Sequence, residues 1–292
     1  MKNAPVRHFA EYALYLALKG AVRALPHGAA RRLGAGLGAL AWGLDRRRRE
    51  IAAGNLAIAF PDLDDRERRR LVGRCFRHFG ALFTDTLSAG RFDAVELCRH
   101  LTLEGWHNLD AAEQAGRGVL IMGAHLGDWE ITNHPIPLYR GPMHVVHRPP
   151  DNPWLDRELR RFRDRFGNRP IDKRRAARGM LRVLRDRGRV AILIDQRVRD
   201  GEGIRVPFFG RPALTTPALA RLSLHTGAPV VPMFGFFRAG GRYRVRLEPP
   251  IWPEGRGDDA VAALTARYLA VVEEEIRARP AEWLWLHDRW KE

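Results

Sequence analysis

The chain has 292 residues, 45% of them hydrophobic, so it can bury a substantial core in one large domain or two small ones. Its 50 Lys and Arg residues outnumber its 34 Asp and Glu residues by 16, which predicts an anionic partner: a membrane, an acidic carrier protein, a phosphorylated substrate or a nucleic acid. The only cysteines, Cys75 and Cys98, exclude a disulfide framework and a cysteine-based zinc motif.

Residues 8–60 are predicted to be helical, because apolar side chains recur there at helical spacing. The sequence Pro26-His27-Gly28 interrupts the pattern, so a second helix is expected from about residue 29 to residue 45. In this second helix, Gly34, Gly36 and Gly38 indicate a close contact with another helix.

The same region is expected to lie on a membrane surface. Its apolar stretches, 12–18 and 33–44, are shorter than the ~20 residues that span a bilayer. The run Arg46-Arg47-Arg48-Arg49 follows them, and anionic lipid attracts such clusters at about 1 kcal/mol per charge. A solvated helix face is the alternative, but the adjoining apolar segments favour interfacial binding.

Residues 61–100 are predicted to form two helices, with Leu71, Cys75, Phe79, Leu82 and Phe83 as a core-facing stripe. From about residue 117, short apolar strands alternate with helices, which predicts an α/β domain with a sheet covered on both faces. The expected strands are 119–122, 143–146, 190–194, 230–237 and 243–247, and the expected helices are 155–166, 176–186, 214–226 and 258–279.

The segment Gly123-Ala124-His125-Leu126-Gly127-Asp128-Trp129-Glu130 carries the clearest chemical signal, because it directly follows a predicted buried strand. In open α/β sheets, reactive groups collect beyond the carboxyl ends of the strands. A histidine there can take a proton from an alcohol if a carboxylate holds its other ring nitrogen. Asp128 and Glu130 could both reach His125 from the turn, and spacing alone does not choose between them.

Other chemistries fit the sequence less well. Ser88 and Ser223 are the only serines and neither lies in G-x-S-x-G, which excludes the usual serine hydrolase. A metal-dependent phosphoesterase could use His125, Asp128 and His134, but a second cluster of ligands is missing. The charge also permits a non-enzymatic binder of anionic membrane or nucleic acid, although no recognised nucleic-acid motif is present.

Several short segments, taken in order, carry a family resemblance. They are residues 47–50 and 55–61, the H-x4-E motif at 125–130, His147-Arg148-Pro149-Pro150-Asp151-Asn152-Pro153, Ile194-Asp195-Gln196, Val206-Pro207-Phe208-Phe209-Gly210 and Trp285-Leu286-His287-Asp288-Arg289-Trp290. Together they extend over nearly the whole chain. The chain thus resembles the bacterial lipid A biosynthesis acyltransferases, the late lauroyl/myristoyl transferases, which share H-x4-D/E with glycerolipid acyltransferases.

The resemblance implies an α/β fold: an αβα sandwich of the glycerolipid-acyltransferase type with an N-terminal membrane-docking helical region. Residues 1–60 would be the membrane-associating helices and residues 61–292 the acyltransferase domain. We expect a monomer on the cytoplasmic face of the inner membrane, peripheral or monotopic through these helices, that binds no nucleic acid.

The resemblance also implies the reaction. A fatty acyl group would pass from an acyl carrier protein or CoA thioester to a hydroxyl of a lipid A precursor, or of another glycolipid or phospholipid acceptor, without a cofactor or metal. It makes His125 the general base and Glu130 its partner. The residues expected at the substrate are Asp128, Arg148, Asp195, Gln196 and Arg289.

Arg148 and Arg289 each have two possible roles. Arg148 can contact a phosphate or stabilise an oxyanion, or it can form a structural ion pair. Asp195, with Gln196 beside it, ends a predicted strand and is expected to edge the site. Arg289 can bind a substrate phosphate or close the fold.

Overall fold

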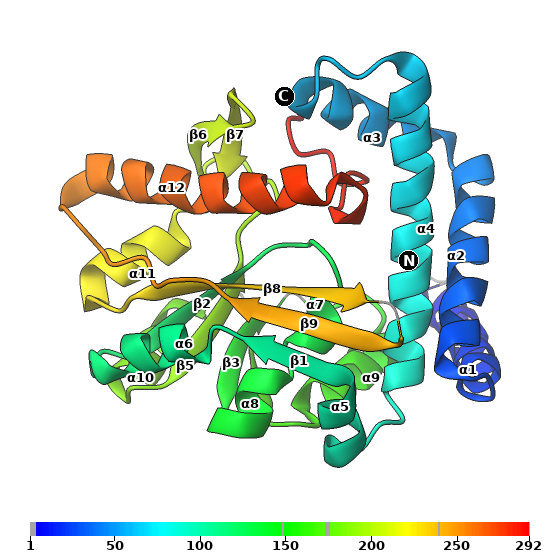
Figure 1. The fold of residues 1–292 in the computed structure, drawn as a ribbon, viewed down its shortest axis with the longest axis horizontal. Coiled ribbons are helices and arrows are strands. Elements are labelled where there is room, and N and C mark those ends of the chain that lie inside the picture. Colours follow the sequence, from blue (N-terminus) through cyan, green and yellow to red (C-terminus); the bar gives the residue numbers. More distant parts are fainter. Residues whose placement is uncertain (1–3, 148, 173–175, 239, 292) are drawn as a thin grey trace.

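The computed structural model describes residues 4–147, 149–172, 176–238 and 240–291. Across these residues a seven-stranded sheet has the order β1-β9-β8-β2-β5-β3-β4, and β6 and β7 form a separate hairpin (Figure 1). The strands from β8 to β4 run parallel to one another, whereas β9 and β1 run the opposite way. The strands are β1 Leu101–Glu104, β2 Val119–Gly123, β3 Met143–His147, β4 Asn168–Asp172, β5 Arg189–Leu193, β6 Ile204–Phe208, β7 Arg211–Thr215, β8 Val230–Arg238 and β9 Arg242–Leu247.

Helices cover both faces of the sheet, as the continuously apolar strands predict. Along β2, Leu120 and Met122 belong to a core that includes α10, α11 and α12, whereas Val119 and Ile121 belong to a second core with α6 and α8. The α/β class expected from the sequence is therefore confirmed. The helices on the sheet are α5 Ala94–His100, α6 Trp106–Gln114, α7 Trp129–Thr132, α8 Pro135–Arg140, α9 Pro153–Asp164, α10 Ala176–Arg185, α11 Ala218–Thr226 and α12 Gly257–Ala278, with the short helix η2 at Pro280–Glu282.

Strands β2 and β5 are neighbours and end side by side at the same edge of the sheet. Strand β2 pairs in parallel with β5, and Gly123 lies opposite Leu193 in the register. Because parallel strands point the same way, the segments that follow them leave the sheet side by side. Residues 124–130 and 194–196 are thereby brought to one place, although they lie some 70 positions apart in sequence.

The remaining helices stand at one side of the molecule, beside the sheet (Figure 1). They are α1 Ala4–Arg23, α2 His27–Leu44, α3 Arg46–Ala59 and α4 Asp65–Ala89. Helix α2 packs along α4 with almost no side-chain layer between them. A Cβ atom on Gly34 would lie 2.3 Å from the Gly80 carbonyl oxygen, and one on Gly38 would lie 2.1 Å from the Phe76 carbonyl oxygen. The close contact predicted for the glycine-rich helix is confirmed at Gly34 and Gly38, whereas Gly36 faces open space.

The outer face of α2 presents a row of leucines to the surroundings. Leu33, Leu37, Leu40 and Leu44 recur every three or four residues, and each is exposed. None of the helices within the described part of the chain combines the length and apolar character needed to cross a bilayer.

Two predicted elements differ from those in the structure, and four strands were not predicted. Leu214 belongs to strand β7, so the helix predicted over 214–226 begins only at Ala218, just after Pro217. The core-facing stripe predicted on α4 also includes two residues that are not fully buried. Leu71, Cys75 and Leu82 are buried, but Phe79 is half-buried and Phe83 is 49% exposed, because both line a cavity.

The unpredicted strands lie at positions where local patterns are weak. Strands β1 and β4 are short and form the two edges of the sheet, and β4 includes Arg169 and Pro170. Strands β6 and β7 are joined by Phe209 and Gly210, both at positive φ, which matches a type I′ hairpin turn.

The α2–α4 contact predicts opposite effects for two glycines of the same helix. We expect Gly38→Ala to lower the free energy of unfolding by about 1–3 kcal/mol, because its methyl group would overlap the α4 backbone. We expect the matched control Gly36→Ala to raise it by about 0.5–1 kcal/mol, because alanine favours a helix and nothing lies near. Urea unfolding measures both values, and equal effects would contradict the described contact.

Candidate active site

His125 and Asp195 meet where β2 and β5 end. Each lies two residues beyond the last residue of its strand. His125 Nδ1 lies 2.9 Å from Asp195 Oδ1, and the His125 backbone N–H donates to Asp195 Oδ2 at 2.9 Å. The parallel register of the two strands thus supplies the carboxylate that holds the imidazole.

Asp195 is buried, with 1% of its surface exposed, and Trp283 Nε1 donates to its Oδ2 at 2.8 Å. Since an ionised carboxylate only accepts hydrogen bonds, His125 Nδ1 carries the proton in this pair. The Nε2 atom of the neutral ring is then the nitrogen that can accept a proton. The His125 side chain is 20% exposed, so the ring is open to a substrate.

The pair has the electrostatics of a general base and its supporting acid. Burial lowers the pKa of His125, but the Asp195 charge and hydrogen bond raise it by more, so the net pKa is raised. Burial raises the pKa of Asp195, and the contacts with His125 and Trp283 lower it by more. Asp195 therefore stays ionised while His125 takes up a proton, and it stabilises the imidazolium.

The turn that carries His125 is fixed through its main chain. Gly127 has φ 65°, and a Cβ atom there would lie 2.2 Å from the Gly235 carbonyl oxygen, so glycine is required. The Gly127 N–H donates to the Glu282 carbonyl at 3.0 Å, and the Asp128 N–H donates to the Gly235 carbonyl at 2.8 Å. The turn is thus held between the end of β8 and the segment that follows α12.

In this structure Asp195, and not Glu130, holds the imidazole, while a role for Glu130 in the reaction stays a prediction. Its Oε2 accepts a 3.0 Å hydrogen bond from Arg163 Nε, and its Oε1 contacts Arg163 Nη2. Burial raises the pKa of Glu130, but the Arg163 charge lowers it by more. The physical reason is the position of Glu130 in the first turn of α7, where it faces Arg163 of α9. Its charge still helps to raise the pKa of His125.

Asp128 is also held by other parts of the protein. The residue is completely buried, and it accepts 2.8 Å hydrogen bonds from Arg31 Nη1 on one oxygen and from the Phe237 backbone N–H on the other. In this structure the Asp128 carboxylate makes structural contacts, and its expected contact with a substrate stays a prediction.

An apolar cavity of about 860 Å³ reaches Trp129 and Glu130, which directly follow the turn that carries His125. The Trp129 ring packs edge to face against His125, with centroids 5.4 Å apart, and lies 5.8 Å from the Phe79 ring. The cavity runs from these rings between α1, α4 and α9 and has a predominantly apolar lining. Its apolar lining residues include Leu14, Tyr15, Leu18, Phe79, Leu82, Phe83, Leu87, Trp129, Leu155, Leu159 and Phe162, and Glu130 is at its wall.

The other predicted substrate residues are placed differently. Gln196 follows Asp195 at the edge of the site and is half-buried. Arg289 is completely buried and donates to the Leu214 carbonyl at 2.7 Å and to Thr215 Oγ1 at 2.5 Å, so it closes the fold and does not face a substrate. Arg148 lies outside the described residues.

The ligand set of the phosphoesterase alternative is not assembled. His134 is buried with its Nδ1 3.2 Å from Asn168 Nδ2, Asp128 is bonded to Arg31, and His125 is bonded to Asp195. Across the described residues, no three His, Cys, Asp or Glu side chains are grouped so that they could hold a metal ion. The three groups proposed as metal ligands therefore serve three separate contacts.

Comparison with known proteins decides the family. The family model for bacterial lipid A biosynthesis acyltransferase matches residues 2–292. The chain belongs to this family. The chain is 29% identical to the lipid A biosynthesis lauroyltransferase of Escherichia coli (strain K12), over 91% of its own length and 87% of the relative's. It is also 29% identical to the palmitoleoyltransferase of the same organism, over 89% and 84% of the two chains.

A further relative acts on a different lipid. The chain is 27% identical to the phosphatidylinositol mannoside acyltransferase of Mycobacterium tuberculosis (strain ATCC 25618 / H37Rv), over 92% of its own length and 85% of the relative's. All three relatives are acyltransferases. The resemblance found in the sequence is confirmed, and this member of the lipid A biosynthesis acyltransferase family is an O-acyltransferase.

Two functional contacts escape sequence reasoning. Trp283 reaches Asp195 from a position 88 residues later, and its only signal is its place in the aromatic closing segment. Arg163 reaches Glu130 from α9, where it is one of several arginines in an amphipathic helix. In each case the contact depends on tertiary packing that a local pattern does not specify.

The His125–Asp195 contact predicts a pKa change that can be measured without turnover. We expect Asp195→Asn to lower the pKa of His125, because the charge that raises it is removed. Imidazole titration by NMR measures this shift, and kcat should fall on the order of 10³–10⁴-fold. The control is Asp200→Asn, whose carboxylate is 80% exposed. An unchanged His125 titration in Asp195→Asn would contradict the assigned pair.

Proposed function

We propose that this enzyme transfers a fatty acyl group from the thioester of an acyl carrier protein or CoA to a hydroxyl of a lipid A precursor, with His125 as the general base. One observation carries the proposal: a partly exposed imidazole, held by a buried carboxylate, packs against Trp129, whose ring lines an apolar cavity of about 860 Å³. A proton acceptor beside a space for a hydrocarbon chain suits acyl transfer to an alcohol.

The proposed reaction is a direct transfer between two bound substrates. His125 Nε2 takes the proton of the acceptor hydroxyl while the alcohol oxygen attacks the thioester carbonyl. The carbon–sulfur bond then breaks, the thiolate leaves, and the imidazolium supplies the proton that makes it a thiol. Asp195 stabilises the imidazolium between these steps and keeps Nε2 directed at the acceptor.

The cavity is proposed to hold the acyl chain. Its catalytic end is marked by Trp129, whose ring touches His125, and by Phe79 of α4. From Phe79 to Leu87, the last α4 residue in the lining, the helix rises by about 12 Å at 1.5 Å per residue. An extended chain lying along α4 would bury apolar surface that is otherwise open to water, which favours binding at about 25 cal/mol per Å².

The acceptor is proposed from the relatives. Two relatives are named for lipid A biosynthesis, and the M. tuberculosis relative is named for phosphatidylinositol mannoside. Both names describe glycolipids, so a glycolipid acceptor is the shared element. The higher identity to the two E. coli relatives favours the lipid A precursor, and another glycolipid or phospholipid is the second candidate.

Peripheral association with the cytoplasmic face of the inner membrane is proposed through residues 1–60. The exposed leucines of α2 and the exposed Phe9 of α1 supply apolar contact. An arginine-lined groove beside α2 supplies charge for anionic headgroups. The arginines in that groove are Arg66, Arg69, Arg70, Arg74 and Arg77, all exposed and all on α4.

Replacing the proposed base tests the function directly. We expect His125→Ala to lose transfer of a radiolabelled acyl group from acyl carrier protein to a lipid A precursor by at least about 10²–10⁴-fold, the usual contribution of a general base. His107→Ala, at an exposed position of α6, is the control and should keep full activity. A folded His125→Ala protein with undiminished transfer would reject the mechanism.

Membrane docking has its own test. We expect Leu37→Asp with Leu40→Asp to weaken binding to vesicles that contain anionic phospholipid, because two charges would enter the apolar contact face. Val95→Asp on α5, which is 61% exposed and outside the row of leucines on α2, should leave binding unchanged. Sedimentation of the protein with vesicles gives the bound fraction. Equal binding by all variants would exclude this face of α2 as the docking surface.

A further inference from the structure

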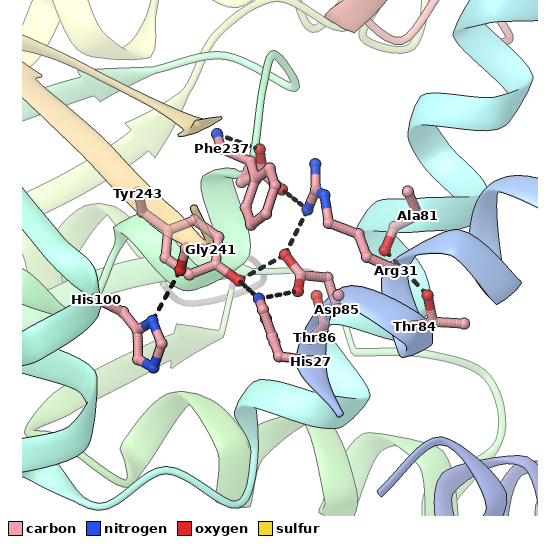
Figure 2. Close-up of polar contacts among 12 residues, drawn as sticks. His27, Arg31, Ala81, Thr84, Asp85, Thr86, His100, Phe237, Gly241 and Tyr243 are labelled. Carbon is pink, nitrogen blue, oxygen red and sulfur yellow. Dashed lines mark hydrogen bonds and ion pairs between the residues drawn. The ribbon is translucent and has the colours of Figure 1, made fainter. Parts of the chain in front are cut away.

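A buried charged cluster lies between α2, α4 and the turn that carries His125, and the proposed mechanism does not use it. Arg31 Nη1 of α2 donates to Asp85 Oδ2 of α4 at 2.5 Å and to Asp128 Oδ1 at 2.8 Å. Both carboxylates are completely buried. Figure 2 shows Arg31 reaching Asp85, whose oxygens also face Tyr243 and His27.

Asp128 is held from two directions. Arg31 binds one oxygen, and the Phe237 backbone N–H at the end of β8 donates to the other at 2.8 Å. The Arg31 guanidinium also stacks on the Phe237 ring, 3.7 Å from its centroid. The carboxylate of Asp128 therefore links helix α2 to the sheet through two hydrogen bonds.

Asp128 is close in sequence to the proposed base, which connects its contacts to the reaction. Asp128 lies three residues after His125 and two residues before Glu130, and its N–H and carbonyl are both hydrogen-bonded within the fold. Any movement of the Asp128 side chain would therefore be passed through a short, fully bonded turn to the proposed base. Reacting groups displaced by about 1 Å can lose a factor of about 10² in rate.

The positive charge of the cluster comes from Arg31. Burial, followed by the nearby His100, lowers the pKa of His27 to about 4, so His27 is neutral at pH 7. Burial raises the pKa of Asp85, the Arg31 charge lowers it, and Asp128 raises it again. Without Arg31, two carboxylates would share one buried site with no compensating charge, and they would separate or take up a proton.

We propose that Arg31 is a positioning residue for acyl transfer: by binding Asp128 against Asp85, it fixes the turn that presents His125 and joins helix α2 to the active site. The proposal rests on the proposed function. It assigns a role to a side chain that touches no substrate and that lies 94 positions before the base.

The test compares Arg31→Met, which keeps the bulk of the side chain and removes its charge, with Arg31→Lys and with the control Arg32→Met at an exposed neighbouring position. Each variant is assayed with acyl-CoA or acyl carrier protein thioester and a detergent-dispersed lipid A precursor. For Arg31→Met we expect kcat to fall about 10²-fold with little change in the KM for the thioester. Arg31→Lys should restore part of the lost kcat, and Arg32→Met should match the wild type.

A double-mutant cycle with Asp128→Asn separates positioning from general stability. Asparagine keeps an acceptor for the Phe237 N–H and loses the ion pair, so we expect it to lower kcat as well. The combined variant Arg31→Met with Asp128→Asn should lose no more kcat than Arg31→Met alone, because both changes remove one contact. If Arg31→Met does not fold, Asp128→Asn alone must show the loss of kcat at constant KM.

The outcomes distinguish the two proposals. A folded Arg31→Met protein with wild-type kcat, or additive losses in the cycle, overturns the positioning role while the transferase function stands. A lower melting temperature with unchanged kcat per folded molecule also overturns it, because the role would then be structural. Wild-type protein that transfers no acyl group from either thioester overturns the proposed function itself.

Discussion

The site depends on one pairing in the sheet, the parallel register of β2 and β5. That register sets Gly123 opposite Leu193, and the two strands therefore release His125 and Asp195 at the same edge. The resulting 2.9 Å contact needs no special loop, because each residue is two positions beyond its strand. Both strands are interior to the sheet, and α7, which follows the turn after β2, contributes Trp129 and Glu130 to the lining of the cavity.

Sequence reasoning identifies His125, the proposed base, but not the carboxylate that the structure places against its ring, and the reason is physical. The end of a continuously apolar strand is a local feature, so His125 and the strand before it can be recognised directly. Which strands become neighbours is a property of the whole sheet, and nothing near His125 in the chain specifies that β5 lies beside β2. Asp195 is placed correctly at the edge of the site for the same local reason, while its contact with His125 depends on the strand order. The nearest acids in sequence, Asp128 and Glu130, are both committed to arginines from other helices.

For the glycines of α2, by contrast, the spacing in the sequence correctly predicts a close helix–helix contact. Gly34 and Gly38 lie one helical turn apart and both meet the α4 backbone, whereas Gly36 lies on the other side of the helix.

The roles of the arginines cannot be predicted from the sequence. In a chain with this many arginines, composition does not separate Arg31, Arg163 and Arg289, which are buried or half-buried in ion pairs and carbonyl contacts, from the exposed arginines of α4. Burial decides their roles, and only the packed structure reveals burial.

The hydrogen bond from Trp283 to Asp195 has a consequence for how the enzyme is made. The carboxylate is buried between β5 and the segment after α12, and its indole donor lies 88 residues later in the chain. A nascent chain that has folded β2 and β5 on the ribosome therefore still has an incompletely bonded acid at its centre. The full set of hydrogen bonds on the Asp195 carboxylate forms only when residue 283 has emerged and docked, so folding of β2 and β5 alone does not complete the site.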